Sequence, residues 1–352
     1  MFSEIKWAFL QIIYNIMTTI FNQDRVLILY SKTSKAFGNL EPLKREITKE
    51  KIKVQSLSCD KSWIEIALWI SRARVILIDQ SNPIISRISI KGTTVVLQCW
   101  HGGGILKKIA FDDIRNSDLY NIKRLNRIHR NINYYVISDE KFIPQFSKAF
   151  NVPPDNILPL GLPRTDIFFK PSKIKRIFAT QKKVILYAPT YRELSAKRVI
   201  LEFPPIPNDL LTHYMFLFRP HPSIEIKDLP SGWEDASIYP IDKLLNSVDV
   251  LISDYSSIIF DYSFYKRPIL FIVPDYDNYK NSERGLYIDL ENLSPSYQIF
   301  KDWENLFEYI NLGRLESSKI WNNFMSACDG KSSIKITKFI KSLYFPKSRK
   351  SV

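Results

Sequence analysis

The residues best suited to chemistry lie in short polar segments that directly follow apolar runs. One mostly apolar run, 248–252, leads into Asp254, Ser256 and Ser257, and a second apolar run, 258–264, follows at once. This pattern predicts a buried strand, a tight turn and the start of a helix. A serine there can cap the helix and leave free N–H groups and the positive end of the helix dipole for an anion, most often a phosphate. Taken alone, the two serines favour a plain helix cap.

A histidine and three glycines follow another β-rich run, 93–100. His101 precedes Gly102, Gly103 and Gly104 in a chain that has only 10 glycines. Glycine lets the backbone approach a ligand closely, and a histidine at such a point can accept a hydroxyl proton near neutral pH. The alternative is a flexible loop with a hydrogen-bonded histidine, and the concentration of glycines argues against it.

Cationic and hydroxyl side chains stand beside other apolar runs. They are Lys107 and Lys108 after the glycines, Thr190 and Arg192 after one run, Arg219 and His221 after another, and Lys331 and Ser332 before a helical segment. A guanidinium can hold a phosphate through two hydrogen bonds, and a neighbouring histidine can add charge or donate a proton. A surface salt bridge is the plainer interpretation of Arg219, but the wholly apolar residues 215–218 before it argue against that. A Lys-Ser pair at a helix start is common, so Lys331 and Ser332 carry less weight.

Strands that alternate with helices are needed to position these segments. The β-rich runs are 25–30, 53–57, 73–79, 93–100, 134–138, 182–189, 213–219, 248–253 and 267–273, most of them separated by segments of helical periodicity. This alternation predicts parallel sheets, and open parallel sheets bind ligands beyond the carboxyl ends of their strands. We therefore expect an α/β protein of two Rossmann-like, doubly wound domains that face each other across a cleft, as in glycosyltransferase-B enzymes.

The chain divides into four parts. A Pro- and Gly-containing segment, 157–163, marks a boundary between two α/β units. We expect an amphipathic helix at 1–24, Rossmann-like domains at 25–163 and 164–335, and a helix with a basic tail at 336–352.

Charge and cysteine content limit the partners. The net charge of +14 over 352 residues favours an anionic partner, such as nucleic acid, acidic lipid headgroups or a phosphorylated substrate. Cys59, Cys99 and Cys328 have neither zinc-site nor disulfide-framework spacing, which is typical of a reducing cytoplasm. With four histidines and no His/Cys cluster, we expect no metal site.

Two interpretations of the N-terminal segment stay open. Apolar residues recur at helical spacing: Ile5, Phe9, Ile12, Ile13, Ile16 and Ile20. The apolar run is shorter than the roughly 20 residues that span a bilayer. The helix therefore lies either on a membrane surface or on the protein's own core, and the basic chain favours the membrane.

Taken in order, the motifs resemble those of the CDP-glycerol glycerophosphotransferase family, the primases and polymerases of teichoic acids and related capsules. The shared segments are 101–108, 187–192, 219–222, 249–261, 266–271, 284–287 and 329–333. The resemblance covers about residues 95–335, and the Asp-Tyr-Ser-Ser block with its following Pro-containing strand is its most specific part. It implies a glycosyltransferase-B fold and transfer of a polyol phosphate from a CDP-activated donor, with CMP leaving.

The resemblance also implies roles for individual residues. His101 matches the histidine proposed as base for the acceptor hydroxyl. Arg219 and His221 match a pair near the donor pyrophosphate, and Ser256 and Ser257 match hydroxyls at the phosphate-binding helix. We place Thr190, Arg192, Asp254, Lys331 and Ser332 with the donor in 164–335, and Gly102, Gly103, Gly104, Lys107 and Lys108 on an acceptor-side loop in 25–163.

The expected reaction is an in-line attack of the acceptor hydroxyl on the β-phosphorus of the donor. His101 takes the proton, and the cations, hydroxyls and helix start stabilise the departing CMP. No cofactor or metal is required. The implied partners are a lipid-linked or polysaccharide acceptor and an anionic membrane surface, which places a peripheral protein on the cytoplasmic face of the cell membrane.

One departure from the family pattern leaves the acceptor open. The family usually reads His-Gly-Thr-Pro-Leu-Lys-Lys, whereas Gly103, Gly104 and Ile105 stand here in place of Thr-Pro. A glycosyltransferase that uses a nucleotide sugar remains an alternative, since fold does not fix substrate. A non-catalytic basic protein that binds membranes is a third, and without a nucleic-acid motif we expect no nucleic-acid partner.

Overall fold

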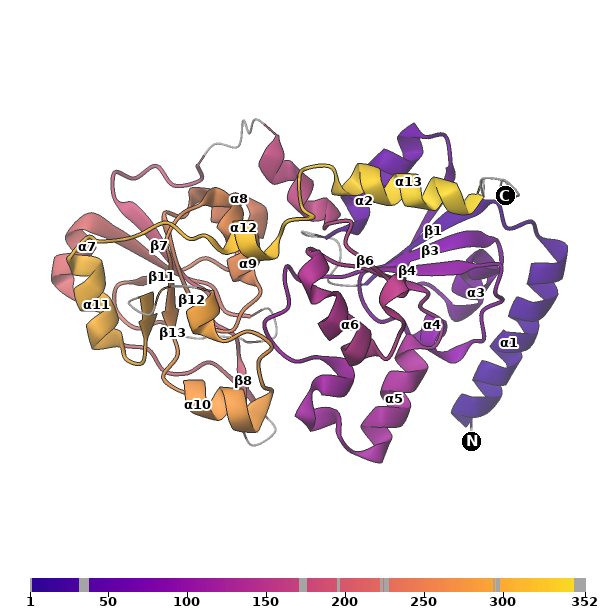
Figure 1. Cartoon of the computed structure of the whole chain (residues 1–352), viewed down its shortest axis with the longest axis horizontal. Coiled ribbons are helices and arrows are strands. Elements are labelled where there is room, and N and C mark those ends of the chain that lie inside the picture. The colour runs from indigo at the N-terminus through magenta and orange to yellow at the C-terminus, as the bar shows by residue number, and fades with distance from the viewer. Residues whose placement is uncertain are drawn as a thin grey trace.

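The computed structural model of the chain describes residues 2–31, 38–170, 176–194, 197–221, 224, 228–293, 295 and 298–344. Within these residues the chain forms two lobes side by side, each built around one parallel sheet (Figure 1). Pro222, which belongs to the motif segment 219–222, lies outside the described residues, and so does 345–352, the end of the expected basic tail.

The first lobe contains a six-stranded parallel sheet in the order β2-β1-β3-β4-β5-β6. The strands are β1 (Arg25–Tyr30), β2 (Lys53–Ser58), β3 (Ala73–Ile78), β4 (Val95–Cys99), β5 (Tyr134–Val136) and β6 (Ile157–Leu158). Its helices are α1 (Phe2–Ile20), α2 (Leu40–Lys49), α3 (Trp63–Ser71), α4 (Pro83–Arg87), α5 (Leu119–His129) and α6 (Ile143–Phe150). The central strands are almost wholly buried because helices cover both faces of the sheet.

The second lobe repeats this design with the strand order β11-β10-β7-β12-β13-β14. The strands are β7 (Lys183–Tyr187), β10 (Tyr214–Phe218), β11 (Trp233–Asp235), β12 (Val250–Ser253), β13 (Ile269–Ile272) and β14 (Ile299–Phe300), and β8 (Arg192–Leu194) pairs with β9 (Lys197–Val199) as a separate hairpin. The helices are α7 (Asn208–His213), α8 (Ile241–Ser247), α9 (Ile258–Tyr262), α10 (Tyr276–Asn278), α11 (Trp303–Asn311) and α12 (Ile320–Phe324). The expected fold class of two doubly wound domains is confirmed.

The last helix, α13 (Ser332–Tyr344), returns to the first lobe and lies beside α2 (Figure 1). Its buried Ile336 and Ile340 join the apolar cluster formed by β1, β3 and α2. Residues near Gly161 carry the chain between the lobes. Gly161 has φ +80°, and a Cβ there would collide with the Ala327 carbonyl carbon at 2.9 Å, so the crossing requires glycine.

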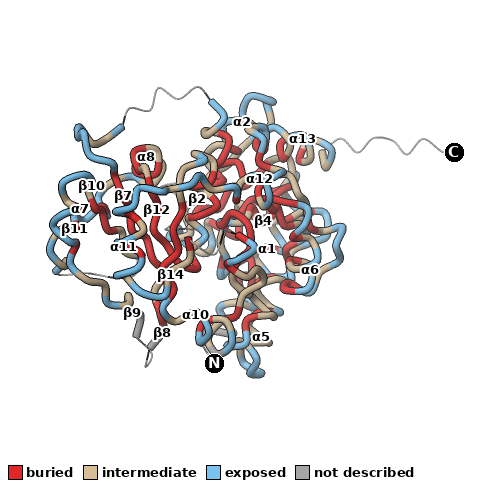
Figure 2. The backbone as a smooth tube through the Cα atoms, turned by 60° about the vertical axis from the view of Figure 1, so that its left-hand side comes forward, coloured by how far each residue is buried: buried red, intermediate tan, exposed pale blue. Residues whose placement is uncertain are grey.

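Helix α1 packs on the protein's own core, as one of the two interpretations expected, and its contact with a membrane stays a prediction. One face packs on α3: Leu10 and Tyr14 are buried, and the Trp7 and Trp63 rings stack at 4.6 Å. The opposite face is a solvent-exposed apolar stripe, which includes Ile5 (61% exposed) and Phe9 (55%). Figure 2 shows the outer parts of the tube in the colour of exposed residues, with the buried colour concentrated on the two sheets. The helix therefore belongs to the core of the first lobe and still presents an apolar surface.

Candidate active site

A cavity of about 290 Å³ lies between the two lobes, at the carboxyl ends of both sheets. It brings together most of the segments that the sequence singled out. Its walls include His101 to Gly104 and Lys107 from the first lobe, and Thr190, Tyr191, His221, Tyr255, Ser256, Ser257 and Arg284 from the second. We refer to it as the cleft cavity.

His101 lies two residues after the end of β4, with its side chain open to the cleft. The surrounding protein disfavours the imidazolium, and the positive charges of Arg164, Arg284 and Lys107 add to this, so the pKa of His101 is lowered to about 4. A hydrogen bond to the main-chain carbonyl of Asp79 acts in the opposite direction and orients the ring. His101 is therefore neutral at physiological pH, as a general base must be.

The three glycines allow the loop after His101 to press against α9 of the other lobe. A Cβ on Gly103 would lie 2.6 Å from the Cβ of Phe260, and Gly104 has φ +51° over the same phenyl ring. A Cβ on Gly102 would lie 3.6 Å from the Cβ of Ser257. The glycines thus set the width of the cleft through contacts between protein segments.

Lys107 lies in the cleft among other cations. Burial, together with the nearby charge of Arg284, lowers its pKa to about 7, and the charge of Asp254 partly opposes this shift. The main chain of Lys107 forms an isolated antiparallel β-bridge with Leu286 of the second lobe. The N–H of Lys108 donates to the carbonyl of Gly285 at 3.0 Å. The main chain of this loop is therefore held by both lobes, and Lys107 lines the cavity between them.

Ser256 and Ser257 form the wall opposite the glycine loop, where β12 ends and α9 begins. The Ser256 hydroxyl accepts a hydrogen bond from the N–H of Ile258 at 3.4 Å, and Ser257 makes no side-chain cap. Ser257 is solvent-exposed and lines the cleft cavity. Its hydroxyl is thus available to a ligand, and binding of phosphate by this wall stays a prediction.

His221 and Thr190 lie on the same side of the cleft. His221 is exposed, and its ring packs edge-on against Tyr191 with centroids 4.9 Å apart. The Thr190 hydroxyl is buried and has no hydrogen-bond partner among the described residues. Because Thr190 lines the cleft cavity, this hydroxyl is a candidate contact for a ligand.

The Arg192 side chain is buried and turned away from the cleft. Its Nη1 donates to Asp254 Oδ2 at 2.8 Å and to the Thr190 carbonyl at 2.8 Å. Its Nε and Nη2 donate to the two carboxylate oxygens of Asp275 at 2.6 and 3.1 Å. Asp254 also accepts from the N–H of Thr190 at 2.8 Å. We therefore propose that Arg192 and Asp254 position the Thr190 turn, in place of the direct phosphate contact expected from the sequence.

Arg219 also bonds to the protein itself. Its Nη1 donates to the carbonyls of Ala236 and Tyr239, each at 2.8 Å. Arg219 is not among the described residues that line the cleft cavity. In this structure it closes the turn after β11, and its proximity to a donor pyrophosphate stays a prediction.

Lys331 and Ser332 lie at the start of α13, away from the described residues that line the cleft cavity. The carboxylate of Asp166 accepts from the N–H groups of Ser332 and Ser333, each at 2.9 Å. An anion therefore already occupies this helix N-terminus, as the helix dipole favours, but it is a protein carboxylate. This contact argues against the phosphate-binding role expected for Lys331 and Ser332.

Arg164 is a residue between the lobes that sequence reasoning missed. It is 5% exposed and joins the two lobes. Its Nη2 bonds both carboxylate oxygens of Asp261 in α9, at 2.9 and 3.0 Å, and its Nη1 donates to the main-chain carbonyl of His101. Its own N–H donates to Asn39 at 3.0 Å. The only sequence signal for Arg164 is its position directly after the boundary segment 157–163, which places it between the two expected domains.

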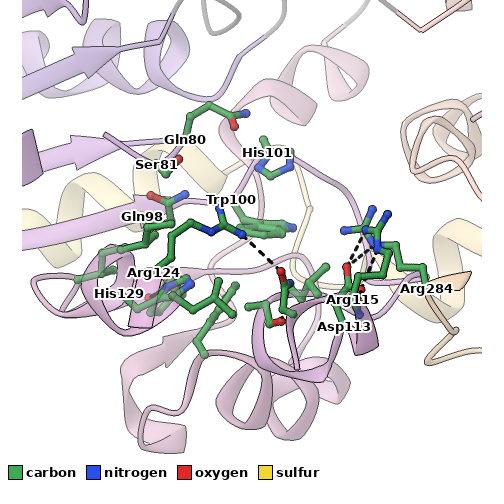
Figure 3. Close-up of a pocket in the computed structure, with 18 residues that line it drawn as sticks. Gln80, Ser81, Gln98, Trp100, His101, Asp113, Arg115, Arg124, His129 and Arg284 are labelled. Carbon is green, nitrogen blue, oxygen red and sulfur yellow. Dashed lines mark hydrogen bonds and ion pairs between the residues drawn. The ribbon is translucent and has the colours of Figure 1, made fainter. Parts of the chain in front are cut away.

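A second cavity, of about 520 Å³, lies within the first lobe beside the cleft (Figure 3). It shares four lining residues with the cleft cavity, namely Trp100, His101, Arg115 and Arg284. The two cavities therefore meet at His101. In Figure 3, Asp113 lies between Arg115 and Arg284; its carboxylate is 2.8 Å from the former and 3.2 Å from the latter.

Comparison with known proteins assigns the chain to a family. A family model described as CDP-glycerol:poly(glycerophosphate) glycerophosphotransferase matches residues 13–342. The teichoic acid glycerol-phosphate primase of Bacillus subtilis (strain 168) is 31% identical over 288 residues, which cover 77% of this chain and 74% of that protein. The chain belongs to this family.

Other members of the family differ in length from this chain. The teichoic acid poly(ribitol-phosphate) polymerase of Bacillus spizizenii is 28% identical over 312 residues, which are 82% of this chain and 49% of that protein. The chain thus spans about three quarters of the primase and about half of the polymerase. The family resemblance read from the motifs is confirmed.

Solved structures show the same fold. The wall teichoic acid polymerase TagF superposes with a TM-score of 0.75 at 22% identity, over 96% of this chain and 94% of that one. A UDP-GlcNAc 2-epimerase from Neisseria meningitidis superposes with a TM-score of 0.53 at 12% identity, over 90% and 100%. Both likenesses support the glycosyltransferase-B arrangement expected from the sequence.

Among the described residues, no group of three or more His, Cys, Asp or Glu side chains is arranged to hold a metal ion. In the same part of the chain, no helix has both the length and the apolar character needed to cross a bilayer.

Proposed function

We propose that this family member transfers a polyol phosphate from a CDP-activated donor to a hydroxyl of a lipid-linked or polymeric cell-surface glycan, with release of CMP. One observation carries the proposal: His101, a neutral base, lies where two cavities meet, opposite a wall of hydroxyls and cations. Donor and acceptor can therefore approach the same imidazole from different sides. The relatives named above, a teichoic acid glycerol-phosphate primase and a teichoic acid poly(ribitol-phosphate) polymerase, support this choice of reaction.

The proposed reaction is one in-line displacement at phosphorus. A ring nitrogen of His101 accepts the proton of the acceptor hydroxyl while its oxygen forms a bond to the β-phosphorus of the donor. The bond from that phosphorus to the bridging oxygen of the pyrophosphate breaks, and CMP leaves with the electron pair. Lys107, Arg284 and His221 supply positive charge or a proton to the phosphates, and Ser256 and Ser257 donate hydrogen bonds.

A donor panel tests the proposal and its nearest alternative. The purified chain is incubated with CDP-glycerol, CDP-ribitol, UDP-sugars and CMP-sugars, and the released nucleotide is identified by mass spectrometry. Release of CMP from a CDP-polyol supports the proposal. Release of UDP from a UDP-sugar, with the CDP-polyols untouched, would identify a glycosyltransferase and overturn it.

The two shifted pKa values predict the pH dependence. For the free enzyme, kcat/KM for the CDP donor should rise as His101 loses its proton near pH 4 and fall as Lys107 loses its proton near pH 7. Lys107→Arg keeps the cation at all these pH values and should remove the fall near pH 7. An unchanged alkaline limb in this variant would exclude Lys107 as its source.

The exposed stripe of α1 supports a peripheral place on the cytoplasmic face of the cell membrane. Ile5, Phe9, Ile12, Ile16 and Ile20 are each at least half exposed, on a helix whose other face is already packed. Monomeric proteins rarely leave such a contiguous apolar surface in water. We propose that the stripe inserts into the interface of an anionic membrane, to which the net charge of +14 attracts the chain.

Point variants can separate the two faces of α1. Phe9→Gln with Ile12→Gln should release the protein from vesicles that contain anionic lipid and leave its thermal unfolding nearly unchanged, because both side chains face solvent. Leu10→Ala on the packed face should instead lower the free energy of unfolding by about 2–5 kcal/mol. Flotation and thermal unfolding measure the two effects, and full membrane binding by the double Gln variant would contradict the proposal.

A further inference from the structure

The cavity within the first lobe is the part of the site that the reaction above leaves without a ligand. It lies beyond the carboxyl ends of β3, β4 and β5, with α5 along one side, and opens toward His101. Its volume of about 520 Å³ is within the usual range for small-molecule sites. We call it the first-lobe cavity and ask what its lining would bind.

Gln98 supplies an unused acceptor in the first-lobe cavity. It lies in β4, its side chain lines the cavity, and it is 4% exposed. Its Oε1 has no hydrogen-bond partner among the described residues. A buried amide oxygen without a donor destabilises a fold by about 1–3 kcal/mol. A ligand that donates a hydrogen bond to Oε1 of Gln98 would remove this cost, so the cavity favours such a ligand. A hydroxyl is the simplest such donor, and Gln80 and Ser81, which also line the cavity, add further polar groups (Figure 3).

Trp100 supplies an aromatic surface between Gln98 and His101. Its indole is held by Phe146, edge-on with centroids 5.5 Å apart, and by Phe150 at 5.4 Å. The His101 ring lies 4.4 Å away on another side. A flat, fixed indole beside hydrogen-bonding side chains suits a unit that has both C–H groups and hydroxyls, such as a polyol or a sugar ring.

Arg124 supplies charge. Its guanidinium extends across the cavity in Figure 3, and its bonds are to neutral amides: Nε to Asn121 at 3.2 Å and Nη2 to Asn116 at 3.4 Å. It forms no ion pair in the part of the chain that the structure describes. Arg115, by contrast, bonds the Asp113 carboxylate through Nε and Nη2, at 3.0 and 2.8 Å. An anionic group next to the hydroxylated unit would give Arg124 a charged partner.

We propose that the first-lobe cavity binds the terminal unit of the acceptor, and that this unit is a hydroxylated group that carries a phosphate ester. A hydroxyl that does not react donates to Gln98, the carbon skeleton lies on Trp100, and the phosphate contacts Arg124. The reacting hydroxyl is then held at His101. This assignment rests on the proposed function, because it takes His101 as the base, but ligand binding can test it without turnover.

The test measures binding of sn-glycerol 3-phosphate, the smallest probe with both features, to the full chain by isothermal titration calorimetry in the presence of excess CDP. Glycerol and inorganic phosphate are measured in parallel. We expect glycerol 3-phosphate to bind more tightly than either and to stay bound when CDP occupies the cleft. Gln98→Leu should weaken glycerol 3-phosphate about tenfold, or about 1.4 kcal/mol, and leave phosphate unaffected. Arg124→Gln should weaken both.

Gln145→Leu is the matched control. Gln145 also has a buried Oε1 without a partner among the described residues, but it lies on α6 outside both cavities. This variant should bind glycerol 3-phosphate like the wild type, and the affinity of all three variants for CDP-glycerol should stay unchanged. Displacement of glycerol 3-phosphate by CDP, equal effects of Gln98→Leu and Gln145→Leu, or no binding at millimolar concentrations would each overturn the assignment. Failure of CDP-glycerol turnover alone would count against the proposed function and not against this site.

Discussion

Replacing His101 with asparagine is expected to lower the rate of polyol-phosphate transfer by about 10²- to 10⁴-fold, the usual contribution of a general base. Asparagine keeps a polar side chain at the meeting point of the two cavities but cannot accept the hydroxyl proton. The loss should appear in kcat, because His101 is not needed to hold the pyrophosphate. Steady-state rates of CMP release with saturating donor and acceptor measure the effect.

His213 provides the control for this substitution. It is an exposed histidine at the end of α7 and is not among the described residues that line either cavity. His213→Asn should therefore transfer at the wild-type rate. If His101→Asn also retained near-normal transfer, the assignment of His101 as the base would fail.

Removal of Arg164 should damage both stability and catalysis. In Arg164→Ala, Asp261, whose side chain is only 13% exposed, loses its ion pair, which lowers the free energy of unfolding by about 3–5 kcal/mol. Burial already raises the pKa of Asp261, and Arg164 is the group that opposes this rise. The variant also frees the main-chain carbonyl of His101, so we expect kcat to fall at least about tenfold even where the fold is retained.

A pH profile distinguishes this positioning role from a purely structural one. The charge of Arg164 contributes to the lowered pKa of His101, so without it that pKa rises toward its ordinary value. The acidic limb of kcat/KM should therefore move to higher pH. Because the cytosine of the donor also titrates in acid, the shift is measured between wild type and variant with the same donor. An acidic limb at the wild-type position would remove the positioning role.

Lys341→Ala is the matched control for the loss of an ion pair. Lys341 bonds Glu50 at 2.6 Å, but both side chains are about 40% exposed. Such surface pairs contribute about 0–1 kcal/mol. This variant should unfold and react like the wild type. Asp261→Asn keeps the shape of the Arg164–Asp261 pair without the carboxylate charge, so its free energy of unfolding and its kcat should lie between those of the wild type and Arg164→Ala.

The sequence was most informative where strands end. Parallel strands in an open sheet direct their carboxyl ends to one edge, so residues such as His101 and Ser257 could be placed at those edges of two sheets. The expected arrangement of two domains across a cleft then brought the two edges together. The apolar runs marked the central strands well, because buried parallel strands are nearly continuous in apolar residues. The two-residue edge strands β6 and β14 carry too little pattern to be found in this way.

Predictions of phosphate contact were least secure, because a basic or hydroxyl residue at a strand end can serve the protein itself. Nothing in the sequence pairs Asp166 with the α13 start or Asp275 with Arg192, since each contact joins residues far apart in the chain. The same holds for Arg164 and Asp261, which meet only once the lobes pack. Periodicity and motif spacing report local structure and cannot show which charge a partner has already neutralised.

The unusual glycine loop has a physical reason that the sequence alone did not give. We interpreted Gly103 and Gly104 as a place where backbone meets ligand, but both press on Phe260 of α9. Any side chain at Gly103 would push the His101 loop away from Ser257 and widen the cleft. The glycines that replace the family's Thr-Pro therefore serve the packing between the lobes, in addition to any effect on the acceptor.

The central claim is that the acceptor hydroxyl attacks the β-phosphorus of the donor. Identifying the bond that forms in the reaction tests this claim most directly. An acceptor whose hydroxyl oxygen is ¹⁸O is incubated with CDP-glycerol and the purified chain, and the products are followed by ³¹P NMR and mass spectrometry. Attack on the β-phosphorus predicts one CMP per transfer and a product phosphodiester whose phosphorus bears the ¹⁸O of the acceptor. Release of a nucleoside diphosphate, or ¹⁸O bonded to carbon and not to phosphorus in the new linkage, would contradict phosphoryl transfer at this cleft.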